Sequence, residues 1–142
     1  MMNVITAEQA IDTERVIGVY EGQRPGDLFI AIGGMHGNES AGVLGIEQLL
    51  VMLKNEPLKN PDFYFKGNFV GIKGNLQALK AKTRYIDRDL NRSFLPVEIA
   101  RIFATPEEEL VGEDKELFAL INHVNYFIAK YQPSRLIVLD LH

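Results

Sequence analysis

In the sequence DLFIAIGGMHGNES, residues 27–40, an apolar run enters a glycine turn. The run at 27–34 has the β-branched and aromatic side chains of a strand. His36 and Glu39 follow at a spacing of three residues, where the chain turns towards a predicted helix. At that spacing the two side chains can reach one point in space and could bind a metal ion together with a third ligand from elsewhere. A glycine turn with a surface histidine and a helix-starting glutamate is the alternative for this pair alone.

Composition bounds the class of protein. The chain has 142 residues, the length of one domain, and a net charge of −4, which gives no electrostatic reason to expect nucleic acid or an anionic membrane as partner. It has no cysteine, which excludes disulfides, thiolate zinc sites and a cysteine nucleophile. We find no signal peptide, and no apolar run approaches the length of about 18 residues that a spanning helix needs. We therefore expect a cytoplasmic protein.

Strands alternate with helices along the chain. RVIGVYEG (15–22) and the run at 27–34 are separated by a Pro-Gly pair and predict a β-hairpin. DFYFKGNFVGIKGN (62–75) predicts a third strand, and RLIVLDLH (135–142) a strand buried on both faces. Helices are predicted at 39–54, 76–82, 97–104 and from a cap at Thr105-Pro106 to Tyr131. This order predicts an α/β fold with a mixed central sheet flanked by helices.

A second histidine follows the last predicted strand. Asp140 and His142 are two residues apart and therefore lie on the same face of that strand. In open α/β sheets ligands bind outside the carboxyl ends of the strands, and His36 also follows a strand end. His36, Glu39 and His142 thus form a His2Glu set of the kind that holds catalytic zinc. The alternatives are that His142 falls there by chance and that Asp140 is a buried acid capped by backbone NH groups.

The segment TRYIDRDLNRSF (83–94) is dense in charge, with Arg84, Arg88 and Arg92 alternating with acids. Arginine is suited to planar, bidentate capture of a carboxylate. A solvated loop of Asp–Arg pairs is the alternative. Four apolar side chains argue against full exposure of this segment, namely Tyr85, Ile86, Leu90 and Phe94.

The blocks GGMHGNE, TRYIDRDLNRSF and VLDLH, in this order, resemble the succinylglutamate desuccinylase/aspartoacylase family, which has the zinc carboxypeptidase-like fold. The resemblance covers nearly the whole chain and roughly the first half of a typical member. It implies that residues 1–142 are the truncated, N-terminal part of a catalytic domain. It also implies that His36, Glu39 and His142 bind Zn²⁺.

The resemblance assigns roles in the charged segment as well. It implies that Arg84 helps to polarise the scissile carbonyl, and that Asn91 and Arg92 bind a carboxylate of the substrate. It makes Asp89 an acid that positions the loop, and Asp140 a group behind the ligand His142. From its helical position alone, His123 is expected at the surface.

The activity implied is zinc-dependent hydrolysis of the amide bond of a small N-acyl amino acid. In the resembled family the general base is a glutamate well beyond the third ligand, and neither Glu47 nor Glu56 has motif support for that role. We therefore expect this chain alone to bind metal weakly and to hydrolyse nothing. The alternatives are a zinc carboxypeptidase acting on peptides and a non-catalytic metal-binding module. A nucleotide-binding domain ranks third, because no Gly-Lys-Ser/Thr follows the glycines.

Overall fold

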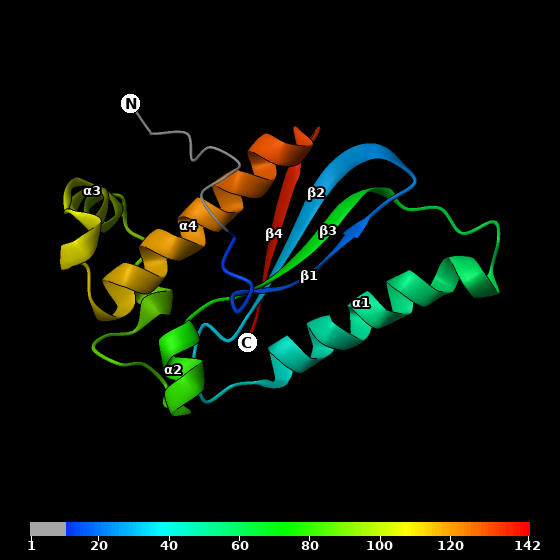
Figure 1. Cartoon of the computed structure of the whole chain (residues 1–142). Helices are drawn as coiled ribbons and strands as arrows, with labels where there is room; N and C mark the ends of the chain where they lie inside the picture. The colour runs from blue at the N-terminus through cyan, green and yellow to red at the C-terminus, as the bar shows by residue number, and fades with distance from the viewer. Residues whose placement is uncertain (1–10) are drawn as a thin grey trace.

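A computed structural model describes residues 11–142 and has a four-stranded mixed sheet with helices on both faces (Figure 1). No helix among the described residues is long and apolar enough to cross a membrane. The strands are β1 (Val16–Glu21), β2 (Arg24–Gly33), β3 (Lys66–Lys73) and β4 (Leu136–Leu141). The α-helices are α1 (Ala41–Lys59), α2 (Leu76–Ala81), α3 (Pro96–Ala104) and α4 (Gly112–Tyr131). The short 3-10 helices are η1 (Leu90–Arg92) and η2 (Glu107–Glu109).

The predicted hairpin is wrong, because the strand order is β1-β3-β2-β4 and β3 lies between the two strands. β2 runs parallel to β3 and to β4, whereas β1 runs antiparallel to β3. The Pro25-Gly26 pair is not a turn but lies inside β2, where the register against β3 shifts between Arg24 and Asp27. A bulge of this kind also favours glycine, so the turn signal had a second meaning.

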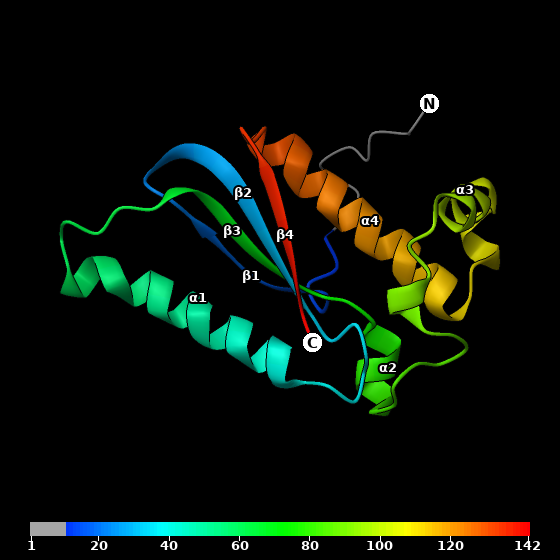
Figure 2. The same cartoon turned by 180° about the vertical axis from the view of Figure 1, so that it is seen from behind.

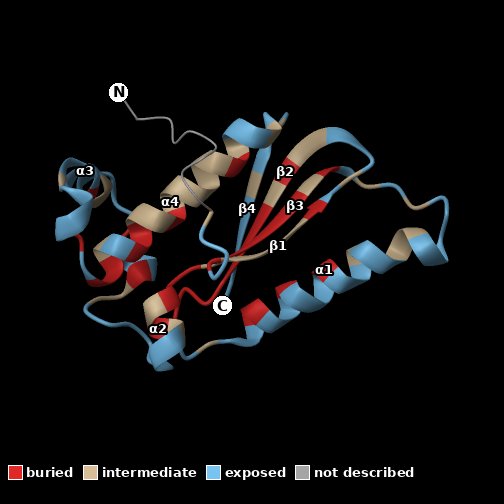
Figure 3. Ribbon diagram, viewed as in Figure 1, coloured by how far each residue is buried: buried red, intermediate tan, exposed pale blue. Residues whose placement is uncertain are grey.

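The two faces of the sheet are covered by different helices, as Figure 2 shows from behind. Alternate residues of β2 point to opposite faces, so Ala31 packs in the cluster with Ile46 and Leu50 of α1. Leu28, Ile30 and Ile32 pack in the other cluster, which includes Leu117, Leu120 and Phe127 of α4. Figure 3 shows the buried residues concentrated along β2, β3 and the helix faces that meet them. The predicted α/β architecture of helices around a mixed sheet is therefore confirmed.

The predicted strand at 135–142 forms as β4, but the expected burial on both faces is wrong. Leu136 is 42% exposed and Val138 is 47% exposed. Among the described strands β4 pairs with β2 alone and forms the edge of the sheet. Because Gly33 pairs with Leu141 in this parallel register, the carboxyl ends of β2 and β4 lie side by side. That pairing brings the end of β4 to the loop that follows β2.

Candidate metal centre

His36, Glu39 and His142 lie together where β2 and β4 end. One ligand atom from each of the three side chains lies within 4.8 Å of the other two. The two imidazole centroids are 5.3 Å apart, and His36 Nδ1 lies 3.3 Å from Glu39 Oε2. Two donors at about 2.0–2.2 Å from a tetrahedral Zn²⁺ are themselves about 3.3–3.5 Å apart. The His36–Glu39 pair has that separation, and two imidazoles with a carboxylate are donor types that suit Zn²⁺.

The turn after β2, rather than a helix, brings the first two side chains together. Helix α1 begins at Ala41 with Ser40 as its N-cap, so the prediction that Glu39 lies in the first helical turn is wrong. Instead the Glu39 NH donates to the His36 carbonyl at 3.2 Å, which closes a tight turn. Gly34 has a φ of +76°, a backbone conformation that favours glycine and lets the chain leave the strand.

Asp89 orients the His36 ring. His36 Nε2 lies 3.0 Å from Asp89 Oδ1, while Nδ1 of the same ring faces Glu39. Burial would raise the pKa of the Asp89 carboxyl, but the His36 imidazole, the Asn91 NH and Arg84 hold it below its ordinary value. An ionised carboxylate behind a ligand histidine fixes the ring and raises its basicity. The sequence assigned Asp89 to the loop, and its contact with His36 was not predicted.

Asp140 stands in the same relation to the second histidine. Its Oδ2 lies 3.0 Å from His142 Nδ1, so Nε2 is the ring nitrogen of His142 that would bind an ion. Burial raises the pKa of the Asp140 carboxyl, against the opposing effect of the His142 and His36 imidazoles. Asp140 is therefore not an acid capped by backbone NH groups, which was the alternative interpretation. It contacts the side chain that the resemblance named as its partner.

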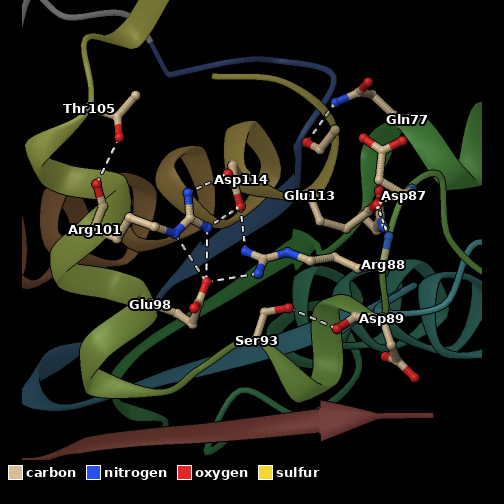
Figure 4. Close-up of polar contacts among 12 residues, drawn as sticks. Gln77, Asp87, Arg88, Asp89, Ser93, Glu98, Arg101, Thr105, Glu113 and Asp114 are labelled. Atoms are coloured by element: carbon tan, nitrogen blue, oxygen red, sulfur yellow. Dashed lines mark hydrogen bonds and ion pairs between the residues drawn. The ribbon is translucent and has the colours of Figure 1, made fainter. Parts of the chain in front are cut away.

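The three arginines of the charged segment separate into two groups. Arg84 Nη2 lies 3.5 Å and Arg92 Nε 3.7 Å from Asp89 Oδ2, and their side chains are 49% and 82% exposed. Both guanidinium groups are thus exposed and lie beside the acid that contacts His36. Arg88 instead forms ion pairs with Glu98 and Asp114 (Figure 4).

Asn91 lies in η1, next to Arg92. Its backbone NH donates to Asp89 Oδ1 at 3.0 Å, so Asp89 caps this short helix while it contacts His36. Asn91 and Arg92 are both exposed. The structure therefore places the two predicted substrate-binding residues on the element that begins at the acid behind His36.

The third histidine is structural. His123 Nε2 accepts the Asp12 NH at 3.0 Å, and its Nδ1 donates to the Ala119 carbonyl at 2.6 Å. Burial lowers the pKa of His123, so the ring is held neutral. Its side chain is half-buried, and the expectation of a surface residue is wrong.

The mixed sheet with helices on both faces and the convergent donors define an α/β domain with a candidate His/Glu metal centre. A sequence profile of the succinylglutamate desuccinylase/aspartoacylase catalytic domain matches residues 25–142, and the chain belongs to that family, as predicted. It is 29% identical to a probable aspartoacylase of Nostoc sp. over 78% of this chain and 33% of the relative. It is 38% identical to a succinylglutamate desuccinylase of Photorhabdus laumondii over 77% of this chain and 31% of the relative.

The fold is confirmed by a solved succinylglutamate desuccinylase from Chromobacterium violaceum. That structure superposes with a TM-score of 0.59 at 24% identity, over 84% of this chain and 33% of the other. The zinc carboxypeptidase-like fold predicted from the sequence is therefore observed. The chain spans about a third of the length of the relatives it matches.

Proposed function

We propose that this chain is the metal-binding part of a zinc-dependent hydrolase that cleaves the amide bond of N-acyl amino acids. The observation that carries the proposal is the convergence of His36, Glu39 and His142 at the carboxyl ends of two parallel strands. Two imidazoles and one carboxylate form a ligand set that suits Zn²⁺ and leaves a coordination position open. A Zn²⁺ ion held there supplies a Lewis acid that polarises a carbonyl oxygen and makes water nucleophilic near neutral pH.

The residues around this centre divide the remaining tasks. Asp89 and Asp140 hold the two imidazole rings through their second nitrogens. Arg84, exposed beside Asp89, would donate to the carbonyl oxygen of the scissile amide as negative charge develops on it. Arg92, with Asn91 beside it, presents an exposed guanidinium to a carboxylate of the substrate.

The names of the relatives point to acidic substrates. The Photorhabdus relative is named for succinylglutamate and the Nostoc relative for an acylated aspartate. Such molecules carry carboxylates at fixed distances from the amide, and a guanidinium near the metal centre selects for them. We infer an N-acyl acidic amino acid as substrate. With no cysteine, the chain suits a reducing compartment such as the cytoplasm.

We propose further that residues 1–142 form the amino-terminal part of the catalytic domain. The exposed apolar side chains of β4 and the coverage of a third of the relatives support this arrangement. If Glu39 binds the metal, it is not free to act as the general base. We infer that a carboxylate outside these residues takes that role, so the chain alone hydrolyses nothing.

The test uses the complete gene product that contains this chain. Metal content and turnover are measured with N-acetylaspartate, N-succinylglutamate and an unblocked peptide, for the wild type and for His36→Ala. We expect about one Zn²⁺ per wild-type chain and turnover of an acylated amino acid. His36→Ala should lose both the bound Zn²⁺ and the turnover. The loss should exceed the roughly 10- to 100-fold caused by removing a residue that only hydrogen-bonds to a metal ligand.

The matched control is His123→Gln, which changes a half-buried histidine away from the centre and should keep its metal. Unchanged metal content in His36→Ala would refute the site. Cleavage of the peptide alone would favour a carboxypeptidase. Bound metal with no turnover of any substrate would favour the non-catalytic module.

A further inference from the structure

The segment between α2 and η1, residues 82–89, carries Arg84 and Asp89 but has no helix or strand of its own. Most of its residues are exposed. A loop of this kind is ordinarily mobile, and a shift of about 1 Å in a positioned group can cost a hundredfold in rate. Something in the fold must therefore hold it in place.

Glu113, in the first turn of α4, holds the middle of this loop. Its carboxylate accepts the backbone NH groups of Ile86 at 3.1 Å, Asp87 at 2.6 Å and Arg88 at 2.9 Å. It also accepts Asn75 Nδ2 at 2.9 Å, and Glu113 is only 1% exposed. Burial would raise the pKa of Glu113, but these donors outweigh it and hold the pKa below its ordinary value. The group is therefore a buried carboxylate ion.

The two functional side chains flank the part of the loop that Glu113 holds. On one side the Arg84 carbonyl accepts the Gly37 NH at 3.2 Å, next to the ligand His36. On the other side Asp89 reaches His36 Nε2 at 3.0 Å. Figure 4 shows Glu113 beside Asp87, with the Arg88 side chain running towards Asp114 and Glu98.

The choice of an ion for this task is costly. Burying a carboxylate costs several kcal/mol before its hydrogen bonds are counted. NH groups in an exposed loop can hydrogen-bond to water, so satisfying them does not require a buried charge. What the carboxylate adds is a single fixed geometry for three successive peptide units.

We propose that Glu113 is a positioning residue for the reaction, which fixes the backbone of residues 86–88 so that Arg84 and Asp89 keep their places at the metal centre. The inference rests on the proposed function. Glu113 would contact neither the substrate nor the ion and would act through the loop at residues 86–88.

Glu116 provides a matched control. It lies three residues further on in the same helix, is 2% exposed, and accepts the NH groups of Leu76 and Gln77, each at 3.1 Å. It also forms a buried ion pair with Arg15. These partners belong to α2 and to the segment before β1, not to the loop that carries Arg84 and Asp89.

The experiment compares Glu113→Gln with Glu116→Gln in the complete gene product. It measures the thermal midpoint, kcat and KM for an N-acyl amino acid, Zn²⁺ affinity, and amide hydrogen exchange at residues 86–88. Both variants should lower the midpoint. Only Glu113→Gln should lower kcat/KM and Zn²⁺ affinity, by about 10- to 100-fold, and speed exchange at 86–88.

Equal kcat/KM and Zn²⁺ affinity in the two variants would overturn the proposal and leave Glu113 a purely structural group. Should Glu113→Gln fail to fold, Glu113→Asp keeps both oxygens and should show a smaller loss of the same kind. If the wild type hydrolyses no N-acyl amino acid, the proposed function fails. Zn²⁺ affinity and amide exchange then still decide the role of Glu113.

Discussion

The carboxylates of Glu113 and Glu39 differ in how many hydrogen-bond donors they receive. Glu113 accepts four N–H donors, from Asn75 and from residues 86–88, and is buried. An ionised carboxylate offers about four lone-pair sites, so that group is saturated. Glu39 has a side chain that is 36% exposed and faces the His36 ring. Both residues are glutamates, so the number of hydrogen-bond donors, and not the residue type, separates a carboxylate that holds the fold from one that is available to a cation.

The strongest test of this difference is to remove each acid in turn. Glu113→Ala should lower the free energy of unfolding by about 3 kcal/mol, because several charge-assisted hydrogen bonds in the interior are lost together. Glu39→Ala should change it by no more than about 0.5 kcal/mol without metal, as at other surface positions. Urea denaturation of the metal-free variants measures both. Equal losses would mean that the donor count does not distinguish the two groups.

A second test concerns Asp89, which contacts the His36 ring and belongs to the loop that Glu113 holds. Asp89→Ala removes the partner of His36 Nε2 and should weaken Zn²⁺ binding by about 10- to 100-fold. Asp89→Asn keeps an oxygen to cap η1 and should lose less. Competition with a chelator of known affinity measures the change. Unchanged Zn²⁺ affinity in Asp89→Ala would show that the ring is oriented by other contacts.

The arginines allow a third comparison, between Arg92 beside the candidate metal centre and Arg101 in an ion-pair network away from it. Arg92→Lys should raise KM about tenfold, because a point charge cannot replace a fork and one charge-assisted hydrogen bond is worth about 1.5 kcal/mol. Arg101→Lys, within the ion-pair network of Glu98 and Asp114, should leave KM unchanged. Steady-state kinetics with an N-acyl acidic amino acid checks both variants. The role of Arg92 is contradicted if the two variants behave alike.

The last prediction concerns the pH dependence of stability. The folded-state pKa of Glu113 is below its unfolded value of about 4.3, so its contribution is fully present above that pH. As the pH falls from the unfolded pKa through the folded pKa, this contribution is lost at about 1.4 kcal/mol for each pH unit between them. Below about pH 4 the free energy of unfolding of the wild type should therefore fall more steeply as the pH decreases. Glu113→Gln should lack this component. Parallel curves for the two proteins would place the titration elsewhere.

The candidate His/Glu set could be predicted because each of its histidines follows a strand end. Parallel strands end at one edge of a sheet, so a histidine after β2 and another after β4 lie at the same edge. The order of the strands was less accessible, since the Pro25-Gly26 pair signals a turn and a bulge equally well. Local sequence does not say that β3 inserts between its neighbours.

Buried charge was the other feature that the sequence concealed. Glu113 and Asp114 stand in the first turn of α4, where any acid is favoured by the helix dipole. Nothing local distinguishes Glu113, which points inward to the loop, from an acid that faces water. The half-buried His123 was missed for a related reason, because its partner Asp12 lies 111 residues away.

The position of the two imidazoles has a mechanical consequence. They come from the ends of different strands, and among the described strands β4 lies at the edge of the sheet, with exposed apolar side chains. An ion bound by both histidines would hold β4 against β2. By linkage, part of the free energy of ion binding would then stabilise the pairing of these two strands, so loss of the ion would weaken the pairing.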